Sequence, residues 1–202
     1  MLTLVDYGLG NIQAFANIYK RLNIPCRVAK TADALADADR IILPGVGAFD
    51  WAMQRLEDSG MRPMLDDLVL KHQRPVLGVC VGMQMMARRS DEGRLPGLGW
   101  IDAEVRRFDE ARFQQKTHLP HMGWNDVATV AHDLFRGLES PRFYFLHSYF
   151  FAPGDPAQTL ATTDYNGPFT SAACNGHIFG VQFHPEKSHQ WGVQLLKNFA
   201  DL

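Results

Sequence analysis

The chain has 202 residues, of which 46% are hydrophobic, and its formal net charge at neutral pH is −2. This length and apolar content are enough for one sizeable core, so we expect a single domain over residues 1–202. The balanced charge, with Lys and Arg scattered, excludes a basic surface for nucleic acid, and no apolar run reaches the roughly 18 residues of a membrane-spanning helix.

Short apolar runs alternate with amphipathic stretches through the first half of the chain. The runs are typical of buried strands, and the stretches between them repeat apolar residues at helical spacing. We therefore predict strands at residues 2–5, 26–29, 41–43 and 75–79 and helices at residues 12–22, 33–38 and 83–87. This order of elements is typical of a parallel α/β fold.

The second half of the chain is richer in strands. We expect them at residues 100–108, 143–150, 159–163, 169–174 and 177–183. Asn175-Gly176 between the last two is a strong hairpin turn. Residues 90–99 read as a loop, and residues 188–199 as a closing helix. The predicted fold class is therefore three-layer α/β, with a mixed, mostly parallel central sheet flanked by helices and a strand-rich second half.

Cys80 follows the apolar run 75–77 and lies between Gly78 and Gly82. Strand, small-residue turn and helix in this order predict an elbow that holds a nucleophile in a strained backbone position, where nearby glycines prevent clashes. A sulfur at a helix N-terminus is also favoured as the thiolate. The alternative for this motif alone is a buried, inert cysteine at the end of a core strand.

His184-Pro185-Glu186 follows the last predicted strand. Residues two apart in an extended chain project to one side, so His184 and Glu186 can lie together while Pro185 limits their freedom. An imidazole between a thiol and a carboxylate can remove the thiol proton, as catalytic triads do. For His184 alone the alternative is a hydrogen-bonded core histidine.

Three other sequence features resemble binding sites. Gly45 and Gly47 follow a predicted strand, and backbone N–H groups there could converge on an anion, although an ordinary strand-to-helix turn is the alternative. The segment 8–13 resembles a dinucleotide-binding turn but has Gln13 at the third glycine position. His118 and His121 lack further ligands at metal-site spacing, so we expect no metal site.

The three cysteines, Cys26, Cys80 and Cys174, are an odd number, and no charged signal segment precedes Asp6. Both features predict a reduced, cytoplasmic protein without disulfides.

Taken together, these motifs resemble those of the class I (triad) glutamine amidotransferases, and more narrowly the glutaminase subunits of imidazole glycerol phosphate synthase. The resemblance covers essentially the whole chain and rests on residues 6–11, 44–49, 78–84, 120–125, 147–149 and 184–188. It implies a flavodoxin-like arrangement of the predicted layers. It also implies hydrolysis of L-glutamine by Cys80, His184 and Glu186, with no cofactor.

The resemblance further assigns residues to binding roles. An oxyanion hole would use the N–H groups of Gly47 and Val81. Contacts to L-glutamine would come from Gly45, Gln84, Ser148 and Tyr149, with His147 as a less certain neighbour. Ammonia would pass to a (β/α)8-barrel cyclase subunit in a heterodimer, which makes imidazole glycerol phosphate and aminoimidazole carboxamide ribotide for histidine biosynthesis. The residues expected at or near that interface are Asn11, Gly123, Trp124, Asn125, Tyr144 and Lys187.

Three alternatives remain open from the sequence. A sister glutaminase could supply ammonia to another pathway, such as surface-sugar biosynthesis. A Cys-His hydrolase could act on γ-glutamyl peptides without a partner. A regulatory protein could retain an inactive triad.

Overall fold

The computed structural model describes residues 1–202. Its first half contains strands β1 (Leu2–Val5), β2 (Cys26–Ala29), β3 (Arg40–Gly45) and β4 (Val76–Cys80), helices α1 (Ile12–Arg21), α2 (Ala32–Leu35), α3 (Phe49–Asp58), α4 (Arg62–Asp66) and α5 (Val81–Met85), and a π-helical turn, Asp67–Lys71. The second half contains strands β5 (Arg89–Ser90), β6 (Ala103–Arg107), β7 (His121–Asp126), β8 (Ala128–Thr129), β9 (Arg142–His147), β10 (Tyr149–Pro153), β11 (Thr159–Asp164), β12 (Pro168–Asn175) and β13 (Ile178–Val181), and helix α6 (His189–Asp201). Four short 3-10 turns cover Glu110–Arg112, Asp133–Phe135, Pro156–Gln158 and Pro185–Lys187.

The main sheet has 11 strands, and its principal order is β2-β1-β3-β4-β13-β12-β10-β6-β5. Neighbours from β2 to β13 pair in parallel, whereas β12 pairs antiparallel with β13, with β10 and with β11. The predicted mixed sheet with a parallel first half is therefore confirmed. Because β13 lies between β4 and β12, the strand that leads to His184 is directly beside the strand that carries Cys80.

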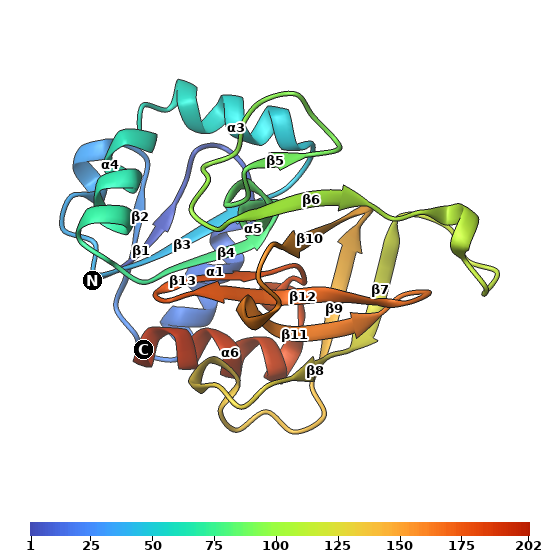
Figure 1. Ribbon diagram of the computed structural model, residues 1–202. Coiled ribbons are helices and arrows are strands. Elements are labelled where there is room, and N and C mark those ends of the chain that lie inside the picture. The colour runs from blue at the N-terminus through green and yellow to red at the C-terminus, as the bar shows by residue number, and fades with distance from the viewer.

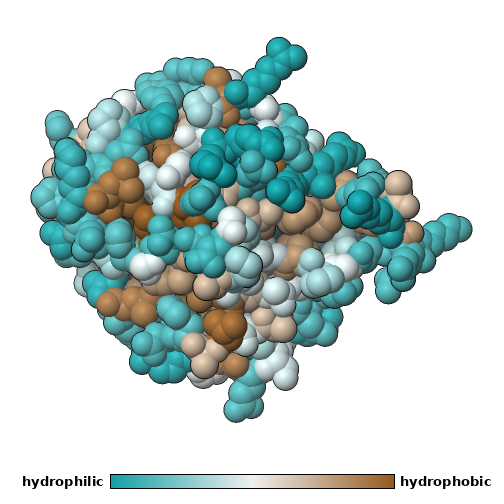
Figure 2. Space-filling view, in the orientation of Figure 1, coloured by the Kyte–Doolittle hydropathy of each residue, from teal (hydrophilic) through white to brown (hydrophobic).

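Helices cover both sides of the parallel strands, which gives three layers. In Figure 1, α3 and α4 lie on one side of the sheet, and α1 and α6 lie on the other. Strands β1 and β4 are buried along their whole length, as expected for parallel strands covered on both faces. No helix combines the length and apolar character that crossing a membrane requires. The face in Figure 2 is mainly hydrophilic, with separate small hydrophobic patches.

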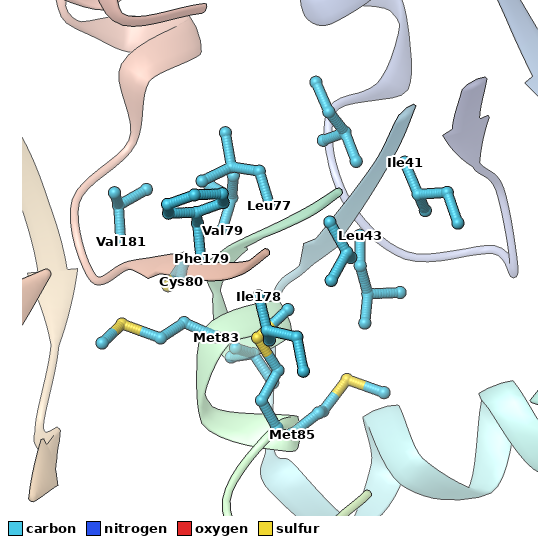
Figure 3. Close-up of a cluster of buried hydrophobic side chains, with 14 of the residues drawn as sticks. Ile41, Leu43, Leu77, Val79, Cys80, Met83, Met85, Ile178, Phe179 and Val181 are labelled. Atoms are coloured by element: carbon cyan, nitrogen blue, oxygen red, sulfur yellow. The ribbon is translucent and has the colours of Figure 1, made fainter. Parts of the chain in front are cut away.

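One continuous core of 54 buried hydrophobic residues holds the layers together. Figure 3 shows the part around Cys80, where aliphatic side chains from β3, β4 and β13 meet methionines of α5. The packed residues include Ile41, Leu43, Leu77, Val79, Met83, Met85, Ile178, Phe179 and Val181. Burying a side chain of this size contributes about 2 kcal/mol, so the core anchors the nucleophile turn firmly.

The predicted strand at residues 143–150 is wrong in one respect, because the chain breaks at Ser148 into β9 and β10. Strand β9 pairs with β7 in a separate two-stranded sheet, with His147 opposite His121. Strand β10 joins the main sheet, with Tyr149 opposite Arg107. The apolar pattern continues across the break because both strands are partly buried, so alternation could not reveal the change of sheet.

Other element boundaries differ from the prediction, and strand β7 and the short strands β5 and β8 were not predicted. Helices α3 and α4 were not predicted, although buried Phe49, Met53 and Leu56 recur at helical spacing in α3. Helix α2 is shorter than the predicted 33–38, whereas α6 extends to Asp201. The predicted hairpin turn is confirmed: Asn175 pairs with Ile178, and Gly176 between them has a φ of 59°.

Candidate active site

Cys80 is the last residue of β4 and the N-cap of α5, and its backbone has φ 55° and ψ −115°. This region is unfavourable for residues other than glycine, so the surroundings must hold it in place. A Cβ on Gly82 would overlap the carbonyl oxygen of Leu43, and a Cβ on Gly78 would lie 2.7 Å from the carbonyl oxygen of Gly82. Both glycines of the motif are therefore required by close backbone approach.

His184 and Glu186 meet as expected, but by another backbone route. His184 Nδ1 lies 2.8 Å from Glu186 Oε1, and both side chains are almost fully buried. The chain is not extended here, because residues Pro185–Lys187 form a 3-10 turn. The Ser188 hydroxyl fixes this turn by donating to the carbonyl of His184 at 2.5 Å. The contact between His184 and Glu186 therefore results from a turn and not from the alternation of side chains along a strand.

The imidazole of His184 is prepared to hold a proton. Burial alone would lower its pKa, but hydrogen bonds with Cys80 and Glu186 and the negative charges of both groups outweigh burial and raise the pKa to about 10. The attraction acts between an imidazolium and a thiolate, so each of these charges stabilises the other. The three groups predicted from separate parts of the chain therefore form one charge-coupled cluster.

A cavity of about 290 Å³ opens beside this cluster. It is lined by nine of the residues that the sequence singled out: Gly47, Cys80, Val81, Gln84, His147, Ser148, Tyr149, His184 and Lys187. Gly45 does not line the cavity, since it packs against the backbone of Val81 and Gly82. The volume suits a small amino acid rather than a long peptide.

The Gln84 amide is oriented by two acceptors. Its Nε2 donates to the carbonyl of Tyr149 at 3.2 Å and to Gln182 Oε1 at 3.0 Å. Both N–H groups are thus used, which leaves the amide oxygen of Gln84 to accept from a ligand. Sequence reasoning missed Gln182, whose Nε2 lies 3.8 Å from Cys80 Sγ. Its position two residues before His184 was a signal that could have suggested it.

Two histidines form a buried pair at the edge of the cavity. His121 Nδ1 lies 3.0 Å from His147 Nε2, and His147 Nδ1 lies 2.7 Å from the carbonyl of Tyr149. Because a carbonyl only accepts, His147 is protonated at Nδ1, and His121 donates to its other nitrogen. Burial, together with the neighbouring histidine, lowers the pKa of His147 to about 3, and burial lowers that of His121 to about 4.

Glu92 also lines the cavity, and nothing in the sequence distinguished it from other acidic loop residues. Its carboxylate accepts the N–H of Phe49 at 2.9 Å, and burial raises its pKa. In return Asp50 accepts the N–H groups of Arg94 and Leu95 at 2.9–3.0 Å. These contacts tie the loop after β5 to the start of α3 and fix the carboxylate of Glu92 at the cavity.

Three of the residues expected at a partner interface lie together. Trp124 is 38% exposed and stacks on His189 with ring centroids 5.2 Å apart, and its edge meets the ring of Tyr144. Lys187, which lines the cavity, has its Nζ 5.8 Å from the centroid of Tyr144. This aromatic cluster therefore adjoins the cavity.

The other three expected interface residues have contacts within the chain. Asn11 caps α1 by accepting the N–H of Ala14 at 3.3 Å. The Asn125 amide donates to the carbonyl of Asp164 at 2.8 Å. Gly123 has a φ of 125°, a backbone conformation that side-chain-bearing residues rarely adopt. Sequence could not separate these local roles from a role in binding.

The chain resembles known proteins along its whole length. The family profile described as "Glutamine amidotransferase class-I" matches residues 3–202. The chain is 59% identical to imidazole glycerol phosphate synthase subunit HisH of Bdellovibrio bacteriovorus, with 100% of both chains covered. It is 48% identical to the subunit of the same name from Leptospira interrogans and 46% identical to subunit HisH 2 of Pseudomonas aeruginosa, again with 100% of both chains covered.

Solved structures share the fold at low sequence identity. A crystal structure of a glutamine amidotransferase superimposes with a TM-score of 0.76 at 18% identity, covering 100% of this chain and 99% of that one. A glutamine amidotransferase from Thermotoga maritima gives 0.62 at 19% identity, covering 99% of this chain and 82% of that one. These similarities concern the arrangement of strands and helices.

Proposed function

This chain belongs to the class-I glutamine amidotransferase family, and from that premise we propose that it is the glutaminase subunit of an imidazole glycerol phosphate synthase. It hydrolyses L-glutamine to L-glutamate and ammonia. The ammonia passes to a cyclase subunit, which makes imidazole glycerol phosphate and aminoimidazole carboxamide ribotide in histidine biosynthesis. The full-length relatives with this subunit name support the proposal. It includes one domain over residues 1–202, no cofactor and a cytoplasmic location.

The first chemical step begins with the Cys80 thiolate and the protonated ring of His184. The sulfur attacks the carboxamide carbon of glutamine, and the electron pair of the carbonyl moves to its oxygen. His184 then gives its proton to the amide nitrogen, the C–N bond breaks and ammonia leaves. A γ-glutamyl thioester remains on Cys80.

The second step uses the same imidazole in the opposite direction. Neutral His184 takes a proton from water while the water oxygen attacks the thioester carbon. The C–S bond then breaks, glutamate leaves, and the sulfur returns as thiolate beside the imidazolium. Glu186 keeps the ring oriented through the 2.8 Å contact with Nδ1 and balances its charge in both steps.

Two backbone N–H groups would stabilise the oxyanion formed in each step. Val81 directly follows the nucleophile and begins α5, so its N–H has no partner within the helix. Gly47 also lines the cavity and has a φ of 86°, which a side-chain-bearing residue would adopt only with strain. Donors at such positions typically contribute about 3 kcal/mol to the stability of the transition state.

The other end of glutamine carries an ammonium and a carboxylate, and the cavity offers complementary groups. Glu92 and the free oxygen of Gln84 suit the ammonium, because one is negative and the other accepts hydrogen bonds. Lys187 and the polar atoms of Ser148 and Tyr149 suit the carboxylate. With its two charged groups held in this way, the side-chain amide of glutamine would face Cys80.

A partner is part of the proposal because ammonia released into water is protonated and lost as a nucleophile. The outer face of the β7–β9 sheet supports a docking role for a (β/α)8-barrel cyclase in a heterodimer. Met122 and Leu146 pair across the two strands and are 65% and 39% exposed, and Leu146 also lines the cavity. Together with Trp124 and Tyr144 they form an apolar surface beside the site, of the kind that anchors protein partners.

The observation that carries the proposal is the meeting of Cys80 and His184 at one cavity, with Glu186 against the far side of the His184 ring, in a chain that matches these subunits along its whole length. The test measures glutamate formation by the chain alone, with the cyclase subunit, and with the cyclase and its ribonucleotide substrate. We expect a rise of about tenfold or more in the full complex.

Variants make this test specific. Trp124→Ala should weaken the complex and reduce the rise, whereas Leu70→Ala, which removes another exposed apolar side chain, should not. Fast hydrolysis by the isolated chain with no further rise would instead indicate a partner-independent γ-glutamyl hydrolase. Slow hydrolysis that this cyclase leaves unchanged would point to a sister pathway.

A further inference from the structure

The sulfur of Cys80 has two polar neighbours besides His184, and they favour opposite protonation states. The carbonyl oxygen of Leu146 lies 3.9 Å from Sγ and can only accept, so it favours the thiol. The side-chain nitrogen of Gln182 lies 3.8 Å from Sγ and can only donate, so it favours the thiolate. Gln182 is fully buried, and its amide therefore cannot turn to water instead.

The orientation of the Gln182 amide follows from its neighbours. The carbonyl of Tyr149 only accepts, so the side-chain nitrogen of Gln84 must face it. This nitrogen also faces Gln182, so the atom of Gln182 at that contact is its oxygen. The nitrogen of Gln182 is then left to face Cys80. A chain of hydrogen bonds from a backbone carbonyl thus determines which end of the amide meets the nucleophile.

The carbonyl that starts this chain is itself fixed. His147 Nδ1 donates to the same oxygen of Tyr149 at 2.7 Å, and His121 holds His147 from the other side at 3.0 Å. The backbone N–H of Gln182 donates to the carbonyl of Ser171 at 2.9 Å, which holds its main chain against β12. Both ends of this chain of hydrogen bonds are thus attached to regular structure.

We propose that Gln182 is a catalytic residue whose side-chain N–H stabilises the anionic sulfur of Cys80 both before attack on glutamine and when the thioester is cleaved. In both states the sulfur is negative, whereas in the thioester between them it is neutral, so the hydrogen bond acts where charge is present. The part of this proposal that concerns glutamine rests on the proposed function, whereas the part that concerns the reactivity of the sulfur does not.

The direct test is alkylation of Cys80 by iodoacetamide in the full-length chain, followed from pH 5 to 9 in the absence of glutamine. Gln182→Met removes both the donor towards sulfur and the acceptor for Gln84 while keeping the volume, and Gln182→Leu removes both with a branched apolar side chain. We expect the alkylation rate at pH 7 to fall about tenfold in both, the lower end for a hydrogen bond to a charged group. Gln13→Met, the same change at an exposed glutamine of α1, should leave it unaltered.

A second variant keeps the inference testable if replacements of Gln182 do not fold, as judged by thermal unfolding. Gln84→Met leaves Gln182 in place but removes the group that orients its amide, so alkylation should slow in the same direction and by less. The double variant Gln84→Met with Gln182→Met should be no slower than Gln182→Met alone. Unchanged alkylation in the folded Gln182 variants, or additive losses in the double variant, would overturn the inference.

Glutamine kinetics separate this inference from the proposed function. For the Gln182 variants we expect kcat to fall about as much as alkylation does, with KM nearly unchanged, because Gln182 does not line the cavity and Gln84 keeps its hydrogen bond to the carbonyl of Tyr149. Slower alkylation in a chain that does not hydrolyse glutamine at all would sustain the inference and refute the function. Normal glutamine turnover and normal alkylation in these variants would refute the inference and leave the proposed function intact.

Discussion

Glu186 holds His184 through one oxygen only. Its Oε1 lies 2.8 Å from His184 Nδ1, whereas Oε2 is buried and has no hydrogen-bond partner in the chain. The orientation of the imidazole and the balance of its charge therefore depend on a single contact.

This contact predicts the result of Glu186→Gln, which can still present an oxygen to Nδ1 but carries no charge. We expect kcat for glutamine hydrolysis to fall about 100-fold, the lower end of what general acid–base catalysis contributes, with KM little changed. Steady-state kinetics of the complex with the cyclase would measure it. Glu139→Gln, an exposed position with the same charge change, is the control. Equal rates in both variants would mean that the charge of Glu186 is not used.

The close backbone contacts of the turn around Cys80 predict that a side chain on Gly82 destabilises the fold by a steric clash, an effect that can be separated from backbone strain. A Cβ on Gly82 would meet a backbone oxygen, so Gly82→Ala should lower the free energy of unfolding by about 3 kcal/mol. Gly176→Ala should cost only about 1 kcal/mol, because its φ of 59° is unfavourable but its surroundings are open. Urea denaturation of the two variants makes the comparison. Similar losses would contradict the close approach at Gly82.

Glu92 predicts a specific effect on substrate binding. Glu92→Gln should raise KM for L-glutamine about tenfold, because the ammonium loses its charged partner. With 4-carbamoylbutanoate, which lacks the α-amino group, the variant and the parent should have the same KM. A difference that persists with this substrate would show that Glu92 acts otherwise.

Asp50 predicts the same pattern indirectly, because its carboxylate fixes the loop that carries Glu92. Asp50→Asn should raise KM for glutamine by less than Glu92→Gln does. Its effect should also disappear with the substrate that lacks the amino group. Asp58→Asn, at the exposed end of the same helix, serves as the control. An effect on kcat alone would exclude this positioning role.

The histidine pair predicts a loss of stability in acid. The pKa values of about 4 for His121 and about 3 for His147 lie below the ordinary value of 6.5, so between these values and pH 6.5 the unfolded chain binds more protons. The free energy of unfolding should therefore fall as the pH drops from 6.5 towards 4, by at most about 1.4 kcal/mol per pH unit and histidine. His121→Asn should flatten this limb, and exposed His72→Asn should not. Urea titrations at several pH values would measure it.

His184 predicts the opposite dependence on the alkaline side. Its pKa is raised to about 10, so above pH 6.5 the His184 ring binds more protons in the folded chain than in the unfolded one. Its contribution to stability is complete below 6.5 and is lost as the pH rises towards 10. The same titrations on His184→Asn should show a flatter alkaline limb. A parallel curve would mean that the imidazolium is not stabilised by folding.

The sequence allowed the triad to be predicted because its signals are local. A nucleophile in a strained turn needs glycines at fixed positions around Cys80, and His184 and Glu186 are separated by one residue. The parallel first half was predictable for a similar reason, since each buried strand is a short apolar run. For His184 and Glu186, however, the contact was predicted from an extended backbone, whereas a 3-10 turn at Pro185 produces it.

What could not be predicted depends on contacts between distant segments. Glu92 reaches the cavity only because Asp50, more than forty positions earlier, accepts backbone N–H groups of its loop. His121 had to be judged without knowing that a break at Ser148 places His147 opposite it. Helix α3 differs from these cases, because its apolar spacing was present in the sequence and should have been recognised.

The packing of β3 against α5 has a consequence for which sequences this site can accept. A Cβ on Gly45 would collide with the backbone nitrogen of Gly82, and a Cβ on Gly82 would collide with the backbone oxygen of Leu43. Every amino acid except proline carries the same backbone N–H, and all carry the same carbonyl, so no replacement at a neighbouring position can make room. No second mutation can therefore compensate for the replacement of either glycine, whichever substitution arises first. Evolutionary change around the nucleophile must leave both glycines in place.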